Sequence, residues 1–242
     1  MKTYCISDVH GHLDNLNRFV QTLEKDDRVF VLGDAIDKGP KSIECLEYIM
    51  NDSRFKMLLG NHEYMMFNTL SSKPGTYSYE DNYDLWVNWN EGLDTLKEYE
   101  SLPRYKQINI FNYIKGLPLN VPNLKIGNRT FYLVHSCPHS DNELTMADVE
   151  YNEDKISDYV WDRVVPGDKL EIDNQIVVAG HTFVQTYLGY DTKEIMPVYD
   201  GMDESDTIKD AHYIDIDGGL ATPFGSAKLI VLCLDDLNYK LV

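Results

Sequence analysis

The first sixty residues alternate short apolar runs with stretches whose apolar residues recur at helical spacing. The runs, which predict buried strands, occupy residues 2–7, 29–32 and 55–59. Helical spacing predicts a helix with an apolar face formed by Leu13, Leu16, Phe19, Val20 and Leu23. Pro40 opens a second predicted helix, with Ile43, Leu46 and Met50 on one face. Strands and helices in this alternating order predict right-handed crossovers, parallel strands and an α/β fold.

The pattern changes near residue 71. Residues 71–128 are rich in aromatic side chains and favour helix, so we expect a helical insertion, either a lid over a site or a plain packed layer. Strands are expected again at residues 130–134, 176–179, 212–216 and 229–234. The last two flank the sequence DGGLATPFGS and are expected to return on each other like a hairpin. Because no repeat or linker divides the chain, we expect a single domain over residues 1–242.

Composition and charge narrow the classes of function. The chain has 242 residues, enough for a sizeable core, and a formal net charge of -18. Such a charge repels nucleic acid and anionic membranes, so we expect neither as a partner. We expect no signal peptide and no transmembrane segment, because no apolar stretch is long enough. The four cysteines are scattered, which predicts neither a disulfide framework nor a thiolate zinc site and favours the cytoplasm.

Polar side chains follow five of the predicted strands. The carboxyl ends of strands in an open α/β sheet converge on one crevice, so we expect these groups to meet there. In chain order they are Asp8 and His10, Asp34 and Asp37, Asn61 and His62, then His135 and finally His181. Any one of them alone is as easily structural, but four of the seven histidines fall at strand ends with polar companions.

Six of these residues form a mixed oxygen and nitrogen donor set. They are Asp8, His10, Asp34, Asn61, His135 and His181. The set suits Mn, Fe or Zn better than calcium. Six ligands are too many for one open catalytic metal and suit two divalent metals that share a carboxylate, as in hydrolases of phosphate esters. Asp34, in the middle of the set, is the candidate for the bridging carboxylate.

The ordered motifs SDVHG, GDAIDKG, GNHE, VHS, GHT and IDIDGG resemble those of the calcineurin-like metallophosphoesterases. Within that family the resemblance is to PPP-type serine/threonine protein phosphatases, especially bacterial and phage members. Similar bacterial proteins include symmetrical diadenosine tetraphosphate hydrolases. The resemblance spans nearly the whole chain and implies a central β-sandwich flanked by helices, with a helical insertion.

The resemblance also implies a role for each residue of the set. Asp8 and His10 would bind one metal, Asp34 would bridge, and Asn61, His135 and His181 would bind the other. The reaction would be direct attack on phosphorus by a hydroxide that bridges the two metals. His62 would donate a proton to the leaving oxygen, and Asp37 would orient its imidazole. Glu63 would begin the following helix and hold the loop.

Two positions depart from the family pattern at the expected phosphate grip. Lys38 stands where the family usually has arginine, and Leu59 stands where the protein phosphatases often have another. Lysine supplies charge but no bidentate fork, and leucine supplies neither. Arg163 in VWDR matches an arginine of bacterial members. The expected phosphate-binding residues are therefore Arg163, Lys38 and Asn61.

These observations predict a phosphomonoesterase that acts on phosphoserine or phosphothreonine, with phosphotyrosine left open. Its partner would be a phosphorylated protein or a small phosphoester. One alternative is a symmetrical dinucleoside tetraphosphate hydrolase, in which Trp86 or Trp89 could stack on a base, although helix core is favoured for both. An alternative of another class is an inactive scaffold with the same fold. The complete ligand set argues against that reading.

Overall fold

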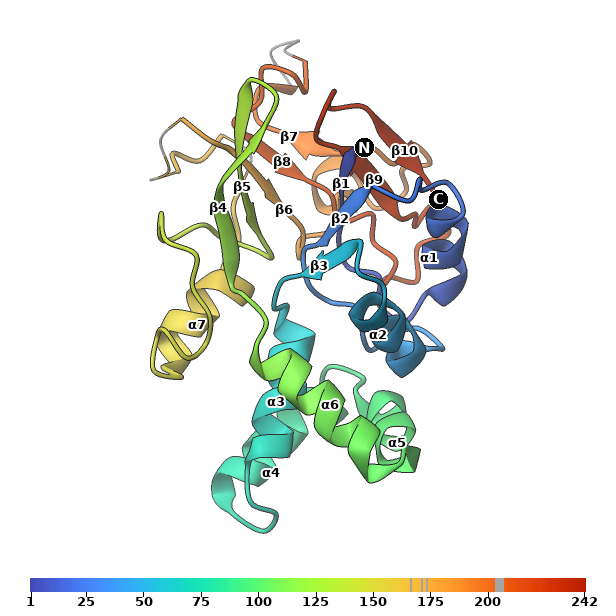
Figure 1. Ribbon diagram of the computed structural model, residues 1–242, viewed down its shortest axis with the longest axis vertical. Coiled ribbons are helices and arrows are strands. Elements are labelled where there is room, and N and C mark those ends of the chain that lie inside the picture. Colours follow the sequence, from blue (N-terminus) through green and yellow to red (C-terminus); the bar gives the residue numbers. More distant parts are fainter. Residues whose placement is uncertain (166, 171, 173, 203–206) are drawn as a thin grey trace.

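The protein is a sandwich of two five-stranded sheets with helices outside it (Figure 1). This architecture comes from a computed structural model that describes residues 1–165, 167–170, 172, 174–202 and 207–242. It confirms the α/β class and the sandwich flanked by helices that the resemblance implied.

The first sheet has the strand order β10-β9-β1-β2-β3. The neighbouring strands β1, β2 and β3 are parallel, as the alternating pattern predicted. The other two strands run antiparallel to their neighbours. The strands are β1 Thr3–Ile6, β2 Arg28–Val31, β3 Phe55–Met57, β9 Ile230–Cys233 and β10 Tyr239–Leu241.

The second sheet has the order β4-β5-β6-β8-β7. Strands β5, β6 and β8 are parallel, and an antiparallel strand closes each edge. The strands are β4 Asn120–Ile126, β5 Arg129–Val134, β6 Ile176–Ala179, β7 Val198–Tyr199 and β8 Tyr213–Asp215. Both sheets therefore have parallel strands whose carboxyl ends can carry a site.

The buried strand residues divide between two cores according to the period of two along each strand. Phe131 and Leu133 of β5 belong to the core between the sheets, together with Phe30 of β2. The alternate residues Tyr132 and Val134 belong to the core beneath the helices. This double burial explains why the strands are continuous apolar runs in the sequence.

Helices α1 and α2 lie beside the first sheet, while α3, α4, α5 and α6 form a group at one end of the molecule (Figure 1). Among the residues that the structure describes, none of the helices is both long and apolar enough to cross a membrane. The bounds are α1 Leu13–Val20, α2 Ser42–Asn51, α3 Asn61–Ser71, α4 Tyr77–Tyr83, the π-helix η1 Asp84–Asn88, α5 Leu93–Ser101, α6 Arg104–Lys115, α7 Glu153–Val160 and α8 Gln185–Leu188.

The expected helical segment 71–128 is wrong at its C-terminal end. The helices end at Lys115, and Asn120–Ile126 forms β4 instead. The register of β4 shifts between Val121 and Leu124, so its apolar residues do not keep the simple alternation of a strand. The helices α4 to α6 share a core with α1 and α2, as expected of a packed layer.

The expected hairpin between the last two predicted strands is also wrong. Strand β8 lies in the second sheet and β9 in the first, so the segment that contains DGGLATPFGS passes from one sheet to the other. The hairpin partner of β9 is β10. Both β8 and β9 are buried along their whole length, so their apolar sequences carry no information about which neighbour each one pairs with.

Candidate metal centre

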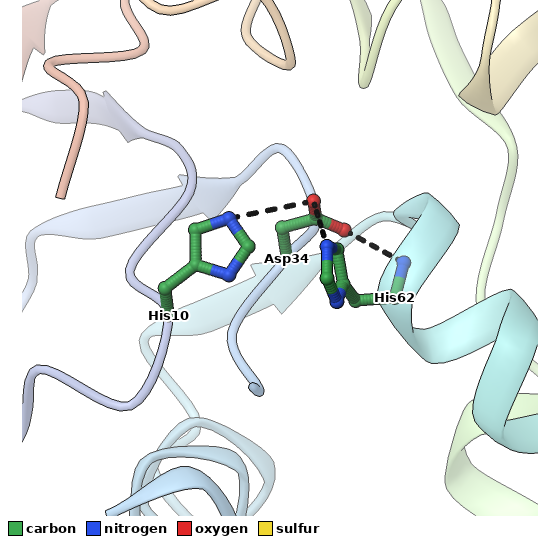
Figure 2. A group of neighbouring side chains, drawn as sticks. All are labelled: His10, Asp34 and His62. Atoms are coloured by element: carbon green, nitrogen blue, oxygen red, sulfur yellow. Dashed lines mark hydrogen bonds and ion pairs between the residues drawn. The ribbon is translucent and has the colours of Figure 1, made fainter. Parts of the chain in front are cut away.

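Polar residues at the ends of strands from both sheets come together at one place. They are Asp8 after β1, Asp34 after β2, Asn61 after β3, His135 after β5 and His181 after β6. Figure 2 shows part of the cluster, with the Asp34 carboxylate between the rings of His10 and His62. The convergence is the one expected of strand carboxyl ends, here contributed by two sheets.

The backbone of this cluster is strained. Six of its residues have a positive φ, in the left-handed region that costs non-glycine residues free energy. The φ values are 52° for Asp8, 43° for His10, 54° for Asp34, 68° for Asp37, 65° for Lys38 and 67° for His181. Strained backbone of this kind concentrates at functional sites, where it holds side chains in positions that regular structure would not allow.

Asp34 lies between two groups of potential metal ligands. Its Oδ2 atom is 3.6 Å from His10 Nε2, 3.6 Å from His135 Nε2 and 3.9 Å from His62 Nε2. One group consists of His10, Asp34 and His62, and the other of Asp34, His135 and His181, with ligand atoms within 4.8 Å of one another in each. The shared carboxylate has the position that a bridging ligand requires, and the bridging role stays a prediction.

Asp8 and Asn61 lie at the two sides of this arrangement. Asp8 Oδ1 is 3.8 Å from His10 Nε2, and its Oδ2 accepts hydrogen bonds from Ser7 Oγ and, at 3.0 Å, from the backbone N–H of His181. Asn61 Oδ1 is 3.0 Å from His135 Nε2. All six predicted ligands are therefore brought together.

Two of the histidines are held in a tautomer that suits a metal ligand. His10 Nδ1 donates to the Ile36 carbonyl at 2.9 Å, and His135 Nδ1 donates to the Leu32 carbonyl at 2.7 Å. Each neutral ring then presents an unprotonated Nε2 to the cluster. The Nε2 lone pair of His135 thus faces the side-chain amide of Asn61 at 3.0 Å, so both side chains offer a ligand atom on the same side of the cluster.

An orphaned atom in the cluster also supports metal binding. In the part of the chain that the structure describes, the buried His181 Nε2 has no hydrogen-bond partner. Buried polar atoms rarely lack a partner, and an imidazole nitrogen beside other donors is a common metal ligand. The donor set and this orphaned atom therefore fit divalent cations.

Burial shifts the pKa values of the cluster. It lowers the pKa of His135 to about 3 and lowers those of His10 and His181, so that all three rings are neutral at pH 7. It raises the pKa of Asp8 and of Asp34 well above the usual value, and neighbouring carboxylates raise both further. Crowded buried carboxylates are costly when ionised, and a bound divalent cation would offset that cost.

We expect the stabilisation by Mn²⁺ to increase with pH. The folded-state pKa values of Asp8 and Asp34 are raised, so in the metal-free protein their ionisation lowers stability as the pH rises above the unfolded value of about 4. A cation must displace the protons that these groups retain. Thermal unfolding with and without Mn²⁺ should therefore give a larger rise in Tm at pH 7.5 than at pH 5.5. An equal rise at both values would contradict this expectation.

His62 and Asp37 form a tight pair beside the cluster. His62 Nδ1 is 2.6 Å from Asp37 Oδ2, and the buried Trp86 donates its Nε1–H to the same oxygen at 2.8 Å. The Asp37 carboxylate therefore fixes the imidazole with Nε2 toward the ligands, 3.9 Å from Asp34. The contact from Trp86 was not anticipated, because it joins residues 49 positions apart.

The two tryptophans considered for base stacking differ. Trp86, in the π-helix η1, is fully buried, which confirms the helix-core interpretation for that residue. Trp89 is 73% exposed, so the same interpretation is wrong there. Trp89 directly follows η1, which ends at Asn88.

Glu63 holds the loops that follow β2 and β3, as expected. Its buried carboxylate accepts hydrogen bonds from the backbone N–H groups of Asp34 and Ala35, each at 2.9 Å, of Ile36 at 3.3 Å and of Gly60 at 3.2 Å. A side chain at Gly60 would collide with Asp34, which explains the glycine by close approach. One carboxylate thus positions the residues on both sides of the cluster.

Replacing Glu63 by alanine is expected to lower the free energy of unfolding by about 3–5 kcal/mol, because four buried N–H groups would lose their acceptor. Chemical denaturation of the metal-free protein measures this change. The matched control is Glu143→Ala, which removes an exposed pair with Lys56 and should stay within about 0.5 kcal/mol of the native protein. A comparable loss in both variants would refute the role of Glu63.

The expected phosphate-binding residues have unequal positions. Arg163 is exposed and donates from Nη1 to Thr182 Oγ1 at 2.8 Å, next to His181. The Lys38 ammonium, whose side chain is 19% exposed, pairs with Glu91 at 3.0 Å. Leu59 is buried in the core and brings no charge to the cluster. Arg163 and the central Asn61 are therefore better placed than Lys38 to meet a phosphate.

Sequence reasoning gave no role to two buried carboxylates of the IDIDGG motif. Asp215 and Asp217 are buried, and Asp217 raises the pKa of Asp8. Asp217 itself has its pKa raised by burial to about 7. The sequence signal that could have identified them is the pair of aspartates at alternate positions of an otherwise apolar run. These groups add to the negative charge that bound cations would neutralise.

A two-sheet α/β fold whose strand ends hold two ligand groups around one carboxylate is typical of hydrolases of phosphate esters that use two metals. A family model described as calcineurin-like phosphoesterase matches residues 1–194. The chain belongs to the calcineurin-like phosphoesterase family, and the resemblance seen in its motifs is confirmed at that level.

Two known relatives of this chain have the same name. The symmetrical bis(5'-nucleosyl)-tetraphosphatase of Actinobacillus pleuropneumoniae is 31% identical over 140 residues, which cover 56% of this chain and 45% of that protein. The protein of the same name from Actinobacillus succinogenes is 36% identical over 67 residues, 26% and 24% of the two chains. The matches thus span less than half the length of these relatives.

A crystal structure of a metallophosphoesterase from Sphaerobacter thermophilus has the same fold. It superposes with a TM-score of 0.58 at 15% identity and covers 100% of this chain and 88% of that one. The narrower expectation of a PPP-type protein phosphatase is not specifically supported by the relatives described above, which are named for another substrate.

Proposed function

We propose that the protein is a hydrolase that uses two divalent cations to cleave symmetrical dinucleoside tetraphosphates into two nucleoside diphosphates. The observation that carries the proposal is the Asp34 carboxylate between two ligand groups, with the His62–Asp37 pair beside it. Membership of the family supports phosphoester hydrolysis, and the names of the relatives support the substrate.

The proposed ligands divide into two sets that share Asp34. Asp8 and His10 complete one set, and Asn61, His135 and His181 complete the other, with Mn, Fe or Zn as the candidate metals. His62 also lies close enough to Asp34 to be a ligand. We assign it to proton transfer instead, because the Asp37 carboxylate 2.6 Å from Nδ1 orients the ring and leaves Nε2 toward the cluster.

Two cations in this site would lower the pKa of a bound water and offset charge on the phosphate oxygens. His62 would supply a proton from Nε2 to the departing oxygen while Asp37 keeps the ring oriented. Arg163 and the amide of Asn61 would interact with the phosphate oxygens where negative charge increases.

A phosphomonoesterase for phosphoserine, phosphothreonine or phosphotyrosine is the other enzymatic candidate. The pairing of Lys38 with Glu91 and the burial of Leu59 leave few cations to grip a terminal phosphate, which counts against this candidate, whereas the names of the relatives support the dinucleotide. The inactive scaffold is the least favoured alternative, because the side chains of all six proposed ligands lie close to one another.

The test is a side-by-side assay of diadenosine tetraphosphate, a phosphothreonine peptide and p-nitrophenyl phosphate. The protein is stripped of metal with a chelator and then supplied with Mn²⁺. We expect Mn²⁺-dependent release of ADP as the only nucleotide product and the highest kcat/KM for the dinucleotide. His212→Asn, a control at an exposed histidine paired with Asp200, should match the native protein. A preference for the phosphopeptide would support the phosphomonoesterase, and bound metal without turnover would support the scaffold.

A further inference from the structure

A cavity of about 640 Å³ lies beyond the ligand His181, between the segment that follows α8 and the crossing from β8 to β9. Its volume is in the range of small-molecule sites. None of the residues assigned above to metal or phosphate binding lines it. Its chemically informative lining residues are Tyr190, Asp191, Lys193, Phe224, Ser226 and Lys228.

Aromatic rings form one wall of this cavity. The rings of Tyr190 and Phe224 have centroids 5.4 Å apart, and the ring of Phe183 lies 6.3 Å from the first and 6.0 Å from the second. Tyr190 is 56% exposed, so an open ring is available to a ligand. Nucleic-acid bases stack on such rings, with roughly 1–3 kcal/mol for each base.

Two lysines give the cavity a positive charge in a chain of net charge -18. Lys193 and Lys228 are exposed, and within the described ranges neither has an ion-pair partner. Six other lysines are paired with carboxylates, namely Lys2, Lys38, Lys41, Lys56, Lys97 and Lys106. Unpaired ammonium groups beside aromatic rings suit a ligand with both a phosphate and a base.

The remaining polar groups suit a sugar. Asp191 offers a carboxylate and Ser226 a hydroxyl on the same lining. A carboxylate beside a nucleotide typically accepts hydrogen bonds from ribose hydroxyls. With two lysines the cavity keeps a net positive charge despite this carboxylate.

One ring of the aromatic cluster, that of Phe183, is close in sequence to the metal centre and contacts the lining residues Tyr190 and Phe224. Phe183 follows the ligand His181 by two residues, a separation of at most about 7 Å between their Cα atoms. The aromatic cluster therefore begins next to the metal ligands. A molecule with its base on these rings could direct its phosphates toward them.

We propose that this cavity binds the nucleoside end of the nucleotide substrate, with the base on Tyr190 and Phe224 and the adjacent phosphates near Lys193 and Lys228. The inference rests on the proposed function, because it assigns the part of that substrate that lies outside the metal centre. Binding of the nucleoside in this cavity would distinguish a dinucleotide from a simple phosphomonoester.

The experiment compares the native protein, Tyr190→Ala and the control Tyr77→Ala, which removes an 83% exposed tyrosine at the start of α4. Two quantities are measured for each protein. The first is the ratio of kcat/KM for diadenosine tetraphosphate to that for p-nitrophenyl phosphate. The second is the Kd of ADP by calorimetry in chelator. In Tyr190→Ala we expect the ratio to fall about tenfold and the ADP affinity to fall by a similar factor. Tyr77→Ala should match the native protein.

Lys193→Met with Lys228→Met should also weaken ADP binding and reduce its dependence on salt. Unchanged ratio and ADP affinity in Tyr190→Ala would overturn the assignment while leaving the proposed function intact. If the native protein does not hydrolyse the dinucleotide but binds ADP through Tyr190, the proposed function fails and the nucleotide cavity stands. If it neither binds ADP nor hydrolyses the dinucleotide, both fail.

Discussion

Asp34→Asn is expected to lower kcat/KM at least about a thousandfold on every phosphoester that the protein hydrolyses. The Asp34 carboxylate lies 3.6 Å from one nitrogen of each ligand group, so both cations would depend on its charge. Asparagine preserves the shape and removes the charge. The factor corresponds to about 4 kcal/mol of lost transition-state stabilisation, in line with the several kcal/mol attributed to metal ions. Steady-state assays in Mn²⁺ measure it.

The stability of Asp34→Asn separates a functional role from a structural one. Burial raises the pKa of Asp34, so its ionised form destabilises the metal-free fold at neutral pH. The asparagine retains an oxygen that can accept the hydrogen bond from the backbone N–H of His62, which is 3.0 Å long in the native protein. In chelator, we therefore expect a Tm at least equal to that of the native protein, and with Mn²⁺ a smaller rise. A Tm several degrees lower in chelator would mark Asp34 as a structural residue.

The metal centre was predictable because its residues are local to strand ends. Asp8, Asp34, His135 and His181 each follow an apolar run, and the alternation of strands and helices predicts parallel strands with one common end. This step explains the convergence within each sheet, since β1 and β2 belong to the first sheet and β5 and β6 to the second. The packing of the two sheets against each other then brings the two sets of groups together, and the local pattern does not contain that packing.

Contacts between distant segments were not predictable in this way. Trp86 donates to Asp37 across 49 positions, and Lys38 pairs with Glu91 across 53. Neither pair has a spacing that secondary structure would impose, so each depends on how the helical segment packs against the first sheet. The pairing partners of β8 and β9 were unpredictable for a related reason. A strand that is buried throughout has no polar positions in its sequence that would identify its neighbours.

His62→Asn should lower the rate of chemistry on an alkyl phosphomonoester by about 10²–10⁴-fold, and on p-nitrophenyl phosphate by much less. An alkoxide must be protonated as it leaves, whereas p-nitrophenolate is stable without a proton. The Asp37 carboxylate lies 2.6 Å from His62 Nδ1 and orients the ring so that Nε2 can donate the proton. Single-turnover rates on both esters, in saturating Mn²⁺, measure the difference, with His212→Asn as the matched control at an exposed histidine.

The same comparison also tests whether His62 is a metal ligand, because its position allows that role. His62 Nε2 is 3.9 Å from Asp34 Oδ2 and belongs with His10 to one group of potential ligands. If His62 were a ligand, its loss would weaken metal binding and slow both esters by the same factor, and added Mn²⁺ would restore part of the rate. A proton donor predicts the reverse, because the leaving group then determines the loss and the metal concentration does not. Equal losses that respond to Mn²⁺ would move His62 from proton transfer to the metal site.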